Sequence, residues 1–376
     1  MTRKSILLGT TALAGAALIA APAFAGNTQS GGNYAVTLGG AFGFNTMWYS
    51  QDVSTGRGRG YAFEIDDAEV YVDAAATADN GIKYGVSIEL NAAGDDTIAT
   101  NEVWAFIDSD QWGRVEMGNQ DDATDRMFIN AEAVMAGRVG WDGNLFQVVN
   151  TGTGGGITDS YASTTDDATK LIYFTPRFAG FQLGAALTPD AGTNGRAGAD
   201  NDGNANNVWG LGANWEGTFG DVGVAVAATY ETGSRPNASG AGSAATEDPK
   251  AVTVGAKVNF AGFSVAAGYA DFYDTGVTTA AAATGTDGGK WWDVGVGYKT
   301  GPWALSIAYL KTAKGNPTGI SDTEWAVVSA GVTYSMAPGW DIQGEVNRFN
   351  GDNINATAVP VDNNGTVVIL TNNFTF

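Results

Sequence analysis

Carboxylate side chains in one long segment are the first candidates for chemistry in this sequence. The acids that we single out lie in or near residues 120–168 and are Asp121, Asp122, Asp125, Glu132 and Asp142. Carboxylates at this density can act in pairs as acid and base, or bind Ca²⁺ through their oxygens. They can also set the electric field of a narrow aqueous passage. Other features of the sequence discriminate between these three roles of the carboxylates.

The absence of two residue types excludes several classes of catalytic site. The 376 residues include no Cys and no His. The chain therefore has no Cys or His zinc site, no Cys nucleophile and no Ser-His-Asp triad. A hydrolase that uses two carboxylates stays chemically open, but no acid lies in a recognisable pocket motif. The glycine run 152–156 lacks the Lys and the following helix of a phosphate-binding loop. We expect no enzymatic activity.

The N-terminus has the order of a secretory signal peptide. A basic start with Arg3 and Lys4 precedes the apolar run 6–20, and Ala23-Phe24-Ala25 forms a small-x-small cleavage site. We expect residues 1–25 to be removed and residues 26–376 to form one domain. The later uncharged stretch 33–51 is interrupted by Gly, Thr and Asn, so it is no spanning helix. A membrane location would then require a closed barrel.

The charge balance limits the partners. The chain has 19 Lys and Arg against 40 Asp and Glu, and loss of Arg3 and Lys4 leaves 17 − 40 = −23. Clustered basic residues are absent, which excludes binding to nucleic acid phosphates. The stretch Asp200-Asn201-Asp202-Gly203 suggests Ca²⁺, but its Gly is out of register for a helix–loop–helix site. We expect no cofactor beyond loosely bound Ca²⁺ that links loops to lipopolysaccharide.

Alternation of apolar and small or polar residues with period two dominates the mature chain. One example is 292–298, where Trp292, Val294 and Val296 alternate with Asp293 and Gly295. This pattern predicts strands. The parity changes near Asp66, which predicts a β-bulge there. The predicted strands are 34–49, 61–76, 82–91, 101–108, 113–119, 169–178, 181–188, 207–216, 221–231, 250–260, 263–273, 290–299, 303–313, 324–335, 340–349 and 365–376.

Turns and aromatic residues point to a membrane barrel. Short connections such as 261–262 and 301–302 alternate with long polar ones such as 232–250 and 275–289. Transmembrane barrels have short periplasmic turns and longer external loops. Many Trp, Tyr and Phe lie near predicted strand ends, as in aromatic girdles. The fold class we expect is all-β, an antiparallel transmembrane barrel of about 16 strands.

With these features the sequence resembles the general diffusion porins of the alphaproteobacterial type. The resemblance rests on the strand pattern, on 114–120 leading into an acidic segment, on 173–178, and on the terminal Phe376. It implies a bacterial outer-membrane homotrimer whose third external loop, about 120–168, folds into the lumen. It also implies that Phe376 is the tag for the barrel-assembly machinery, although Asn372 departs from the usual apolar residue.

The same resemblance implies a basic row on the wall that faces the acidic loop. The candidates are Arg57, Arg59, Lys83 and Arg114; parity places Lys83 and Arg114 inward, and Arg57 and Arg59 are expected near the mouth. A field between such rows would orient dipolar solutes. Inward strand charges have an acidic excess, which predicts weak cation preference. The acids in that tally are Glu69, Asp73, Glu89, Glu116, Asp293, Asp341 and Glu345, and the bases are Lys83, Arg114, Lys257 and Lys299.

We therefore expect a water-filled channel for passive diffusion of small hydrophilic solutes and ions, in contact with outer-membrane lipid and lipopolysaccharide. The alternative within the membrane is a substrate-specific channel, for example for sugars. That alternative needs an aromatic track along the lumen, and parity places most aromatic residues outward. A soluble adhesive β-protein is the remaining reading, and it would extract without detergent.

Overall fold

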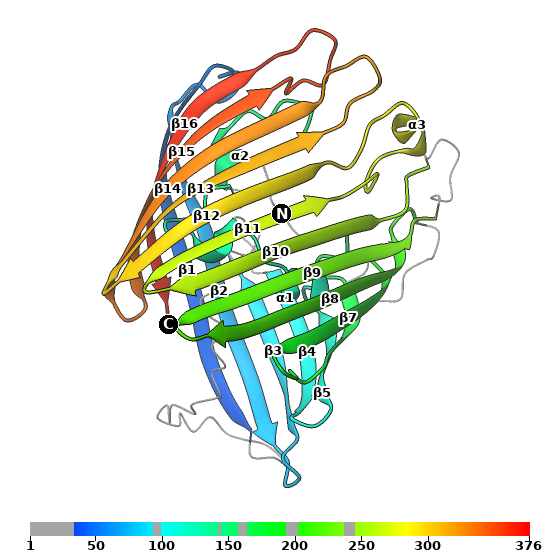
Figure 1. Ribbon diagram of the computed structural model, residues 1–376, viewed down its shortest axis with the longest axis vertical. Helices are drawn as coiled ribbons and strands as arrows, with labels where there is room; N and C mark the ends of the chain where they lie inside the picture. The colour runs from blue at the N-terminus through cyan, green and yellow to red at the C-terminus, as the bar shows by residue number, and fades with distance from the viewer. Residues whose placement is uncertain (1–33, 93–98, 142–143, 157–163, 193–201, 237–244) are drawn as a thin grey trace.

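The computed structural model describes residues 34–92, 99–141, 144–156, 164–192, 202–236 and 245–376. Within them, sixteen antiparallel strands form a closed barrel in which each strand pairs with its sequence neighbours and β16 pairs with β1 (Figure 1). The predicted fold class is confirmed. The predicted signal segment 1–25 lies outside the described residues.

The ends of the strands agree with the predicted ones to within four residues. The strands are β1 (Ala35–Gln51), β2 (Tyr61–Thr77), β3 (Lys83–Asn91), β4 (Ala99–Ser109), β5 (Gly113–Asn119), β6 (Thr169–Phe174), β7 (Phe181–Asp190), β8 (Asn206–Phe219), β9 (Val222–Ser234), β10 (Lys250–Phe260), β11 (Phe263–Asp271), β12 (Lys290–Thr300), β13 (Trp303–Lys314), β14 (Thr323–Ala337), β15 (Trp340–Asp352) and β16 (Asn363–Thr375). Short helices are α1 (Ala123–Met127), the 3₁₀ helix η1 (Ala131–Val134), α2 (Asn144–Val148) and α3 (Thr279–Ala282).

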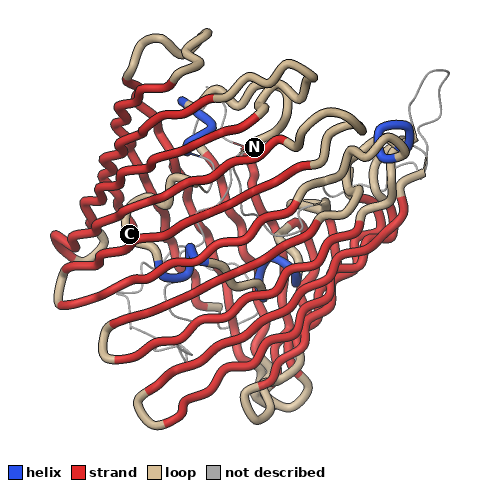
Figure 2. The backbone as a smooth tube through the Cα atoms, turned by 45° about the horizontal axis from the view of Figure 1, so that its top comes forward, coloured by secondary structure: helices blue, strands red, loops and turns tan. Residues whose placement is uncertain are grey.

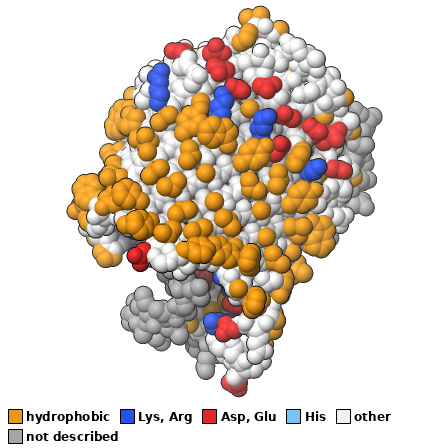
Figure 3. Space-filling model, viewed as in Figure 1, with side chains coloured by type: hydrophobic (Ala, Val, Ile, Leu, Met, Phe, Trp, Pro, Cys, Tyr) orange, Lys and Arg blue, Asp and Glu red, His pale blue; other side chains and the backbone are white. Residues whose placement is uncertain are grey.

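The two faces of each strand meet different surroundings. On β12, Trp292 and Val294 are 46% and 39% exposed on the outer face, whereas Asp293 on the inner face is 2% exposed. Outward apolar side chains form a broad band over the strands (Figure 3). A lipid-facing barrel is expected to show this inversion, with an apolar outside and a polar inside.

One strand carries the predicted irregularity. In the ladder of β1 and β2, Phe42 pairs with Ala68 but Phe44 pairs with Ile65. Between these two pairs β2 advances by three residues while β1 advances by two. The extra residue places a β-bulge at 66–67, as predicted. A bulge changes the side to which successive side chains point, and here it affects two acids that bind the lumen segment.

The two ends of the barrel differ in their connections. One end has tight turns such as that between β10 and β11, where Ala261 and Gly262 have φ of 50° and 84°. Two positive φ values match the type I′ turn that suits twisted hairpins. The other end has the long connections, and we call the ends the short-turn end and the long-loop end. No helix among the described residues is long and apolar enough to cross a membrane.

Candidate functional site

The connection between β5 and β6 lies inside the barrel, and we call residues 120–168 the lumen segment. Its helix α1 packs against β6 to β9, and η1 packs against β11 to β13. Further on, the Gly140 amide donates to Glu345 on β15, and the Gln51 side chain of β1 donates to the Val148 carbonyl (2.8 Å). Figure 2 shows these short helices within the ring of strands. The described parts of the segment follow the wall from β6 round to β1.

Inward glycines make room for this path. A Cβ atom at Gly255 would lie 1.8 Å from the Ile129 carbonyl oxygen, and one at Gly331 would lie 1.8 Å from that of Ala136. At Gly297 the corresponding distance to a loop carbonyl oxygen would be 2.3 Å. Glycine in a strand often marks close approach of another backbone. The alternation in the sequence showed inward glycines, but it did not show that they seat the lumen segment.

Two acids of the wall anchor the segment by its backbone. Asp293 accepts hydrogen bonds from the amides of Ala131 (2.9 Å) and Gly268 (2.6 Å). Glu345 accepts one from the Gly140 amide (2.5 Å). Each of these two acids is 2% exposed. Both were counted among the inward charges, and they also satisfy backbone donors that would otherwise be buried without a partner.

Arg138 of the lumen segment joins the bulge on β2. Its guanidinium pairs with Asp66, and a second nitrogen lies 3.1 Å from a carboxylate oxygen of Asp67. The exposed fractions of the three side chains are 9%, 11% and 13%. Because of the bulge, two consecutive acids reach the same cation. Sequence reasoning missed Arg138, and the signal that could have found it was the parity change beside two adjacent acids.

A second ion-pair network ties the start of the segment to β5. Glu116 is fully buried, and its two carboxylate oxygens pair with Arg114 on the wall and Arg126 in α1. Arg114 also lies 3.6 Å from Asp108 and over the ring of Phe106, 4.2 Å from its centroid. The predicted inward direction of Arg114 is thus seen, with its charge shared between two acids and a ring face.

The first three predicted acids lie at the beginning of the segment. Asp122 is the N-cap of α1 and accepts from the amides of Thr124 (2.7 Å) and Asp125 (3.4 Å). Burial raises the pKa of Asp122. The pKa of Asp125 is raised by burial and by the neighbouring charge of Asp121, which is partly exposed. Asp122 therefore caps the helix, Asp125 is buried within it, and Asp121 is the more exposed of the three.

Asp142 and Glu132 are the remaining two predicted acids. Asp142 lies outside the described residues. Glu132, in the first turn of η1, lines a cavity of about 710 Å³ that extends to the short-turn end of β10 to β12. Lys257 and Lys299 line the same cavity, and neither forms an ion pair within the described chain. Acidic and basic side chains thus line one cavity, and the two lysines are not among the predicted basic row.

The four basic candidates lie at opposite ends of the barrel. Arg57 and Arg59 are in the loop 52–60 at the long-loop end, where Arg57 donates to the Gln147 carbonyl and Arg59 lies 5.9 Å from the Tyr61 ring centroid. Lys83 and Arg114 are instead beside short turns, at the first and second positions of β3 and β5. These positions do not form one row opposite the loop acids.

The wall that the helices of the lumen segment leave open is acidic. Strands β2 to β5 contain nine acidic and two basic side chains. The acids are Glu64, Asp66, Asp67, Glu69, Asp73, Glu89, Glu102, Asp108 and Glu116, and the bases are Lys83 and Arg114. The resemblance implied a basic wall at this place.

One group of carboxylates has spacing suitable for a cation. Ligand oxygens of Glu102, Asp121 and Asp167 all lie within 4.8 Å of one another. Hard cations such as Ca²⁺ select such oxygens. In the stretch 200–203 singled out by sequence, residues 200 and 201 lie outside the described part, and Asp202 accepts from the Asn204 amide (2.9 Å). Among the described residues, the first group is the one with carboxylates spaced for a cation.

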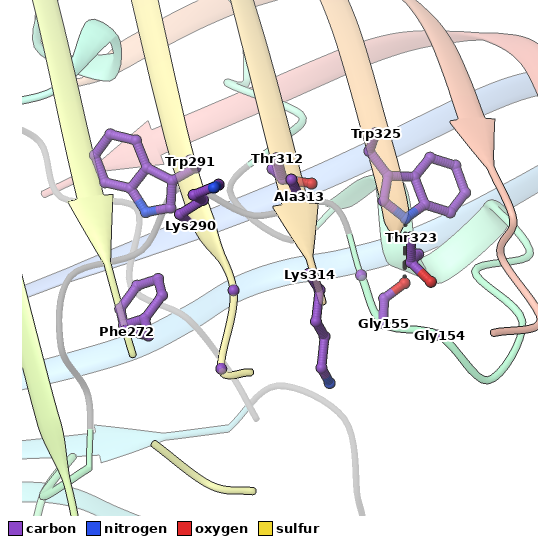
Figure 4. Close-up of a pocket in the computed structure, with 13 residues that line it drawn as sticks. Gly154, Gly155, Phe272, Lys290, Trp291, Thr312, Ala313, Lys314, Thr323 and Trp325 are labelled. Atoms are coloured by element: carbon purple, nitrogen blue, oxygen red, sulfur yellow. Dashed lines mark hydrogen bonds between the residues drawn. The ribbon is translucent and has the colours of Figure 1, made fainter. Parts of the chain in front are cut away.

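The glycine run 152–156 has a packing role. Figure 4 shows Gly154 and Gly155 beside Trp325 and Thr323 at a pocket of about 160 Å³. The Trp325 indole donates to the Gly155 carbonyl (3.2 Å), and a Cβ at Gly154 would lie 2.3 Å from the Thr323 hydroxyl oxygen. The run thus lets the lumen segment pass closely along the long-loop ends of the strands.

Comparison with known proteins agrees with this architecture. Residues 9–354 match a family described as Gram-negative porin. A loop-deletion mutant of Vibrio cholerae OmpT has a TM-score of 0.60 at 13% identity, covering 91% of this chain and 99% of that one. A Rhodobacter blastica porin variant gives 0.58 at 16%, covering 91% and 100%.

The anion-selective porin from Comamonas acidovorans is also similar in structure. Its TM-score is 0.60 at 15% identity, with 91% and 100% of the two chains covered. No curated protein matches the sequence. The structural likenesses show the fold, and the family match extends over most of the chain. This chain therefore belongs to the Gram-negative porin family and is a general porin channel of the outer membrane.

Proposed function

We propose that this porin passes small hydrophilic solutes and ions by passive diffusion through a water-filled lumen, with a weak preference for cations. The observation that carries the preference is the acidic wall of β2 to β5, where nine acids face two bases of the wall and Arg126 and Arg138 of the lumen segment. A ring or row of carboxylates along a pore raises the local concentration of cations and opposes anions.

Most of the seven acids in the tally of inward charges are nearly buried. Five of the seven acids in that tally are at most 8% exposed, and they are Glu69, Glu89, Glu116, Asp293 and Glu345. Asp293 and Glu345 bind backbone amides, so their charge acts on ions through the field rather than by contact. Asp73 is exposed on the open wall and is the best placed for direct contact.

The assembly around the barrel is also proposed. We infer a homotrimer in contact with outer-membrane lipid and lipopolysaccharide, assembled with help from the terminal residue. Support for the last point comes from the closure of the barrel, where Phe376 and Gly40 exchange backbone hydrogen bonds of 3.0 and 3.1 Å. The final residue thus completes the junction between the first and last strands.

A substrate-specific channel is a second candidate, because some aromatic rings do face the lumen. Trp104 and Phe106 lie on the inner face of β4 with ring centroids 6.0 Å apart, and the Arg114 guanidinium stacks over both. Aromatic faces beside hydrogen-bonding groups can hold a sugar ring. Most other exposed rings face outward, so this cluster forms a short patch and does not extend into a track.

The test is the conductance of detergent-extracted protein in a planar bilayer, with a KCl gradient around 0.1 M. We expect stepwise openings and a reversal potential on the cation side. A reversal potential on the anion side would refute the selectivity. Absence of openings from folded protein would refute the open channel. Saturable block of the current by maltotriose, but not by sorbitol, would favour the sugar-specific alternative.

A further inference from the structure

The cavity beside η1 continues from the lumen segment to the short-turn ends of β10 and β12. Its volume of about 710 Å³ lies within the range of small-molecule sites, roughly 300–1,000 Å³. Residues 132–139 of the lumen segment form one side of it, and residues of β10 to β13 form most of the other. The anchors of the lumen segment described above do not involve the lysines of this cavity, so the position of these lysines calls for another explanation.

Small residues around the two lysines, Lys257 on β10 and Lys299 on β12, keep the cavity open. In the ladder, Lys257 is opposite Ala225 on β9 and Ala266 on β11. Lys299 is opposite Ala304 on β13. Residues opposite each other in a ladder project to the same face of the sheet, and a methyl group leaves space beside a long side chain. These alanines therefore leave room for a solute next to both ammonium groups.

The charges that line the cavity have both signs. Within the described residues, Lys257 and Lys299 make no ion pair and no side-chain hydrogen bond. Glu132 lines the cavity from the lumen segment, and Asp221 lies exposed in the short turn between β8 and β9. Arg138 is also in the lining, but the two acids of the bulge compensate its charge. The cavity thus has two cations available to a solute and, at separate positions, carboxylates.

The register of the strands places one lysine level with η1. Lys257 is paired through Ala266 with the level of Gly295 on β12. The helix η1 contacts the wall at Gly295, where a Cβ would lie 3.1 Å from η1 side chains. Two strand spacings, about 10 Å, therefore separate Lys257 from the contact of the helix that carries Glu132. Lys299 lies farther along β12, beside the short turn. A carboxylate and an ammonium group thus approach the cavity from two sides, at a separation that a small solute spans.

We propose that this cavity binds zwitterionic amino acids, with the carboxylate at Lys257 and Lys299 and the ammonium group at Glu132. A solute with one charge would meet an attractive and a repulsive group in the cavity, whereas a zwitterion has a partner at each end. Hydrogen bonds between charged groups are among the strong ones. Because the net charge of such a solute is zero, the acidic wall of β2 to β5 does not exclude it. The proposal names a solute class for the diffusion channel proposed above and rests on that channel for entry of the solute.

Binding of 4-aminobutyrate to the full-length protein in non-ionic detergent tests the proposal, measured by saturation-transfer NMR of the solute. Butyrate and butylammonium are the matched probes, because each keeps the carbon chain and lacks one of the two charges. A hydrogen bond between charged groups contributes enough to change affinity about tenfold or more. We therefore expect saturable binding of 4-aminobutyrate and at least about tenfold weaker binding of each single-charge probe. Equal binding of the three probes would overturn the proposal.

Variants identify the groups that bind the solute. Lys257→Gln with Lys299→Gln, and separately Glu132→Gln, should each weaken binding of 4-aminobutyrate at least about tenfold. Lys290→Gln is the matched control, because that lysine is exposed on the outer face of the strand that carries Lys299. The control should bind as the unmodified protein does. Undiminished binding in the double lysine variant would overturn the proposal. If that variant does not assemble, Lys299→Gln alone is measured, and unchanged binding refutes the site.

Planar-bilayer recording of the same protein separates failure of the site from failure of the channel. The NMR measurement needs no current, so the two results are independent. Stepwise openings without saturable binding would overturn the site and leave the channel. Saturable binding without openings would refute the open channel and support the site. Openings together with binding, and a current that 4-aminobutyrate reduces saturably, would support both.

Discussion

Arg138 joins the lumen segment to the bulge on β2 through two ion pairs. Its guanidinium compensates Asp66 and Asp67, and all three side chains are nearly buried. Removal of one partner from a buried ion pair typically costs about 3–5 kcal/mol. We expect Arg138→Ala to release the segment from β2, giving noisier single-channel currents and a stronger cation preference. Bilayer recording measures both, and Arg59→Ala is the control because that side chain is exposed on a loop.

The cause of any change is tested by neutralising the acids as well. Asp66→Asn with Asp67→Asn in the Arg138→Ala background removes the repulsion between two unpaired carboxylates. Quieter currents are expected in this triple variant than in Arg138→Ala alone. A quiet, unchanged channel in Arg138→Ala itself would show that the other anchors, such as Glu345 with the Gly140 amide, suffice to hold the segment.

Among the elements, the strands were predictable from the residues, whereas only the resemblance placed residues 120–168 in the lumen, and the path of that segment was not predicted. Strand parity follows from a physical constraint local to each strand, because one face meets lipid and the other does not. The path of residues 120–168 depends on contacts between distant elements, such as Ala131 with Asp293, that no local pattern encodes. For the same reason the acids were found as a group, while their roles as caps and anchors were not. Arg126 and Arg138 were missed because each is a lone cation in an acidic segment.

Inward glycines are the feature of the strands that the lumen segment requires. At Gly331 on β14, even the Cβ of alanine would lie 1.8 Å from the Ala136 carbonyl oxygen. Overpacking of this kind typically costs about 1–3 kcal/mol. We expect Gly331→Ala to displace the segment and change the single-channel conductance, with additional subconductance levels. Bilayer recordings, together with hydrogen exchange of the Ala136 region, measure the displacement.

The matched control is Gly223→Ala on β9. A Cβ there would have its nearest neighbours at 3.7 Å, on Asn259, which is ordinary contact. The control is expected to conduct as the unmodified channel does. If both alanine variants conducted alike, the strand backbone at Gly331 would shift to make room for the methyl group. The position of the lumen segment would then not depend on the absence of a side chain at Gly331.

For the whole molecule, the preference for cations should depend on salt. The acids on β2 to β5 act on ions across water, and the Debye length shortens from about 10 Å at 0.1 M to about 3 Å at 1 M. We expect the cation-to-anion permeability ratio from reversal potentials to fall towards one over this range. Asp73→Asn, which neutralises an exposed acid of the open wall, should lower the ratio at 0.1 M and have little effect at 1 M.

A ratio that stays high at 1 M would contradict this expectation and would mean that ions lose water and contact carboxylates directly. The group of Glu102, Asp121 and Asp167 is where such contact is most favoured, because three carboxylates lie within 4.8 Å. Asp221→Asn is the control for Asp73→Asn, since Asp221 lies in the short turn between β8 and β9. If both variants lowered the permeability ratio equally, the selectivity would depend on the net charge of the molecule. If only Asp73→Asn lowered the ratio, the selectivity would depend on the acidic wall.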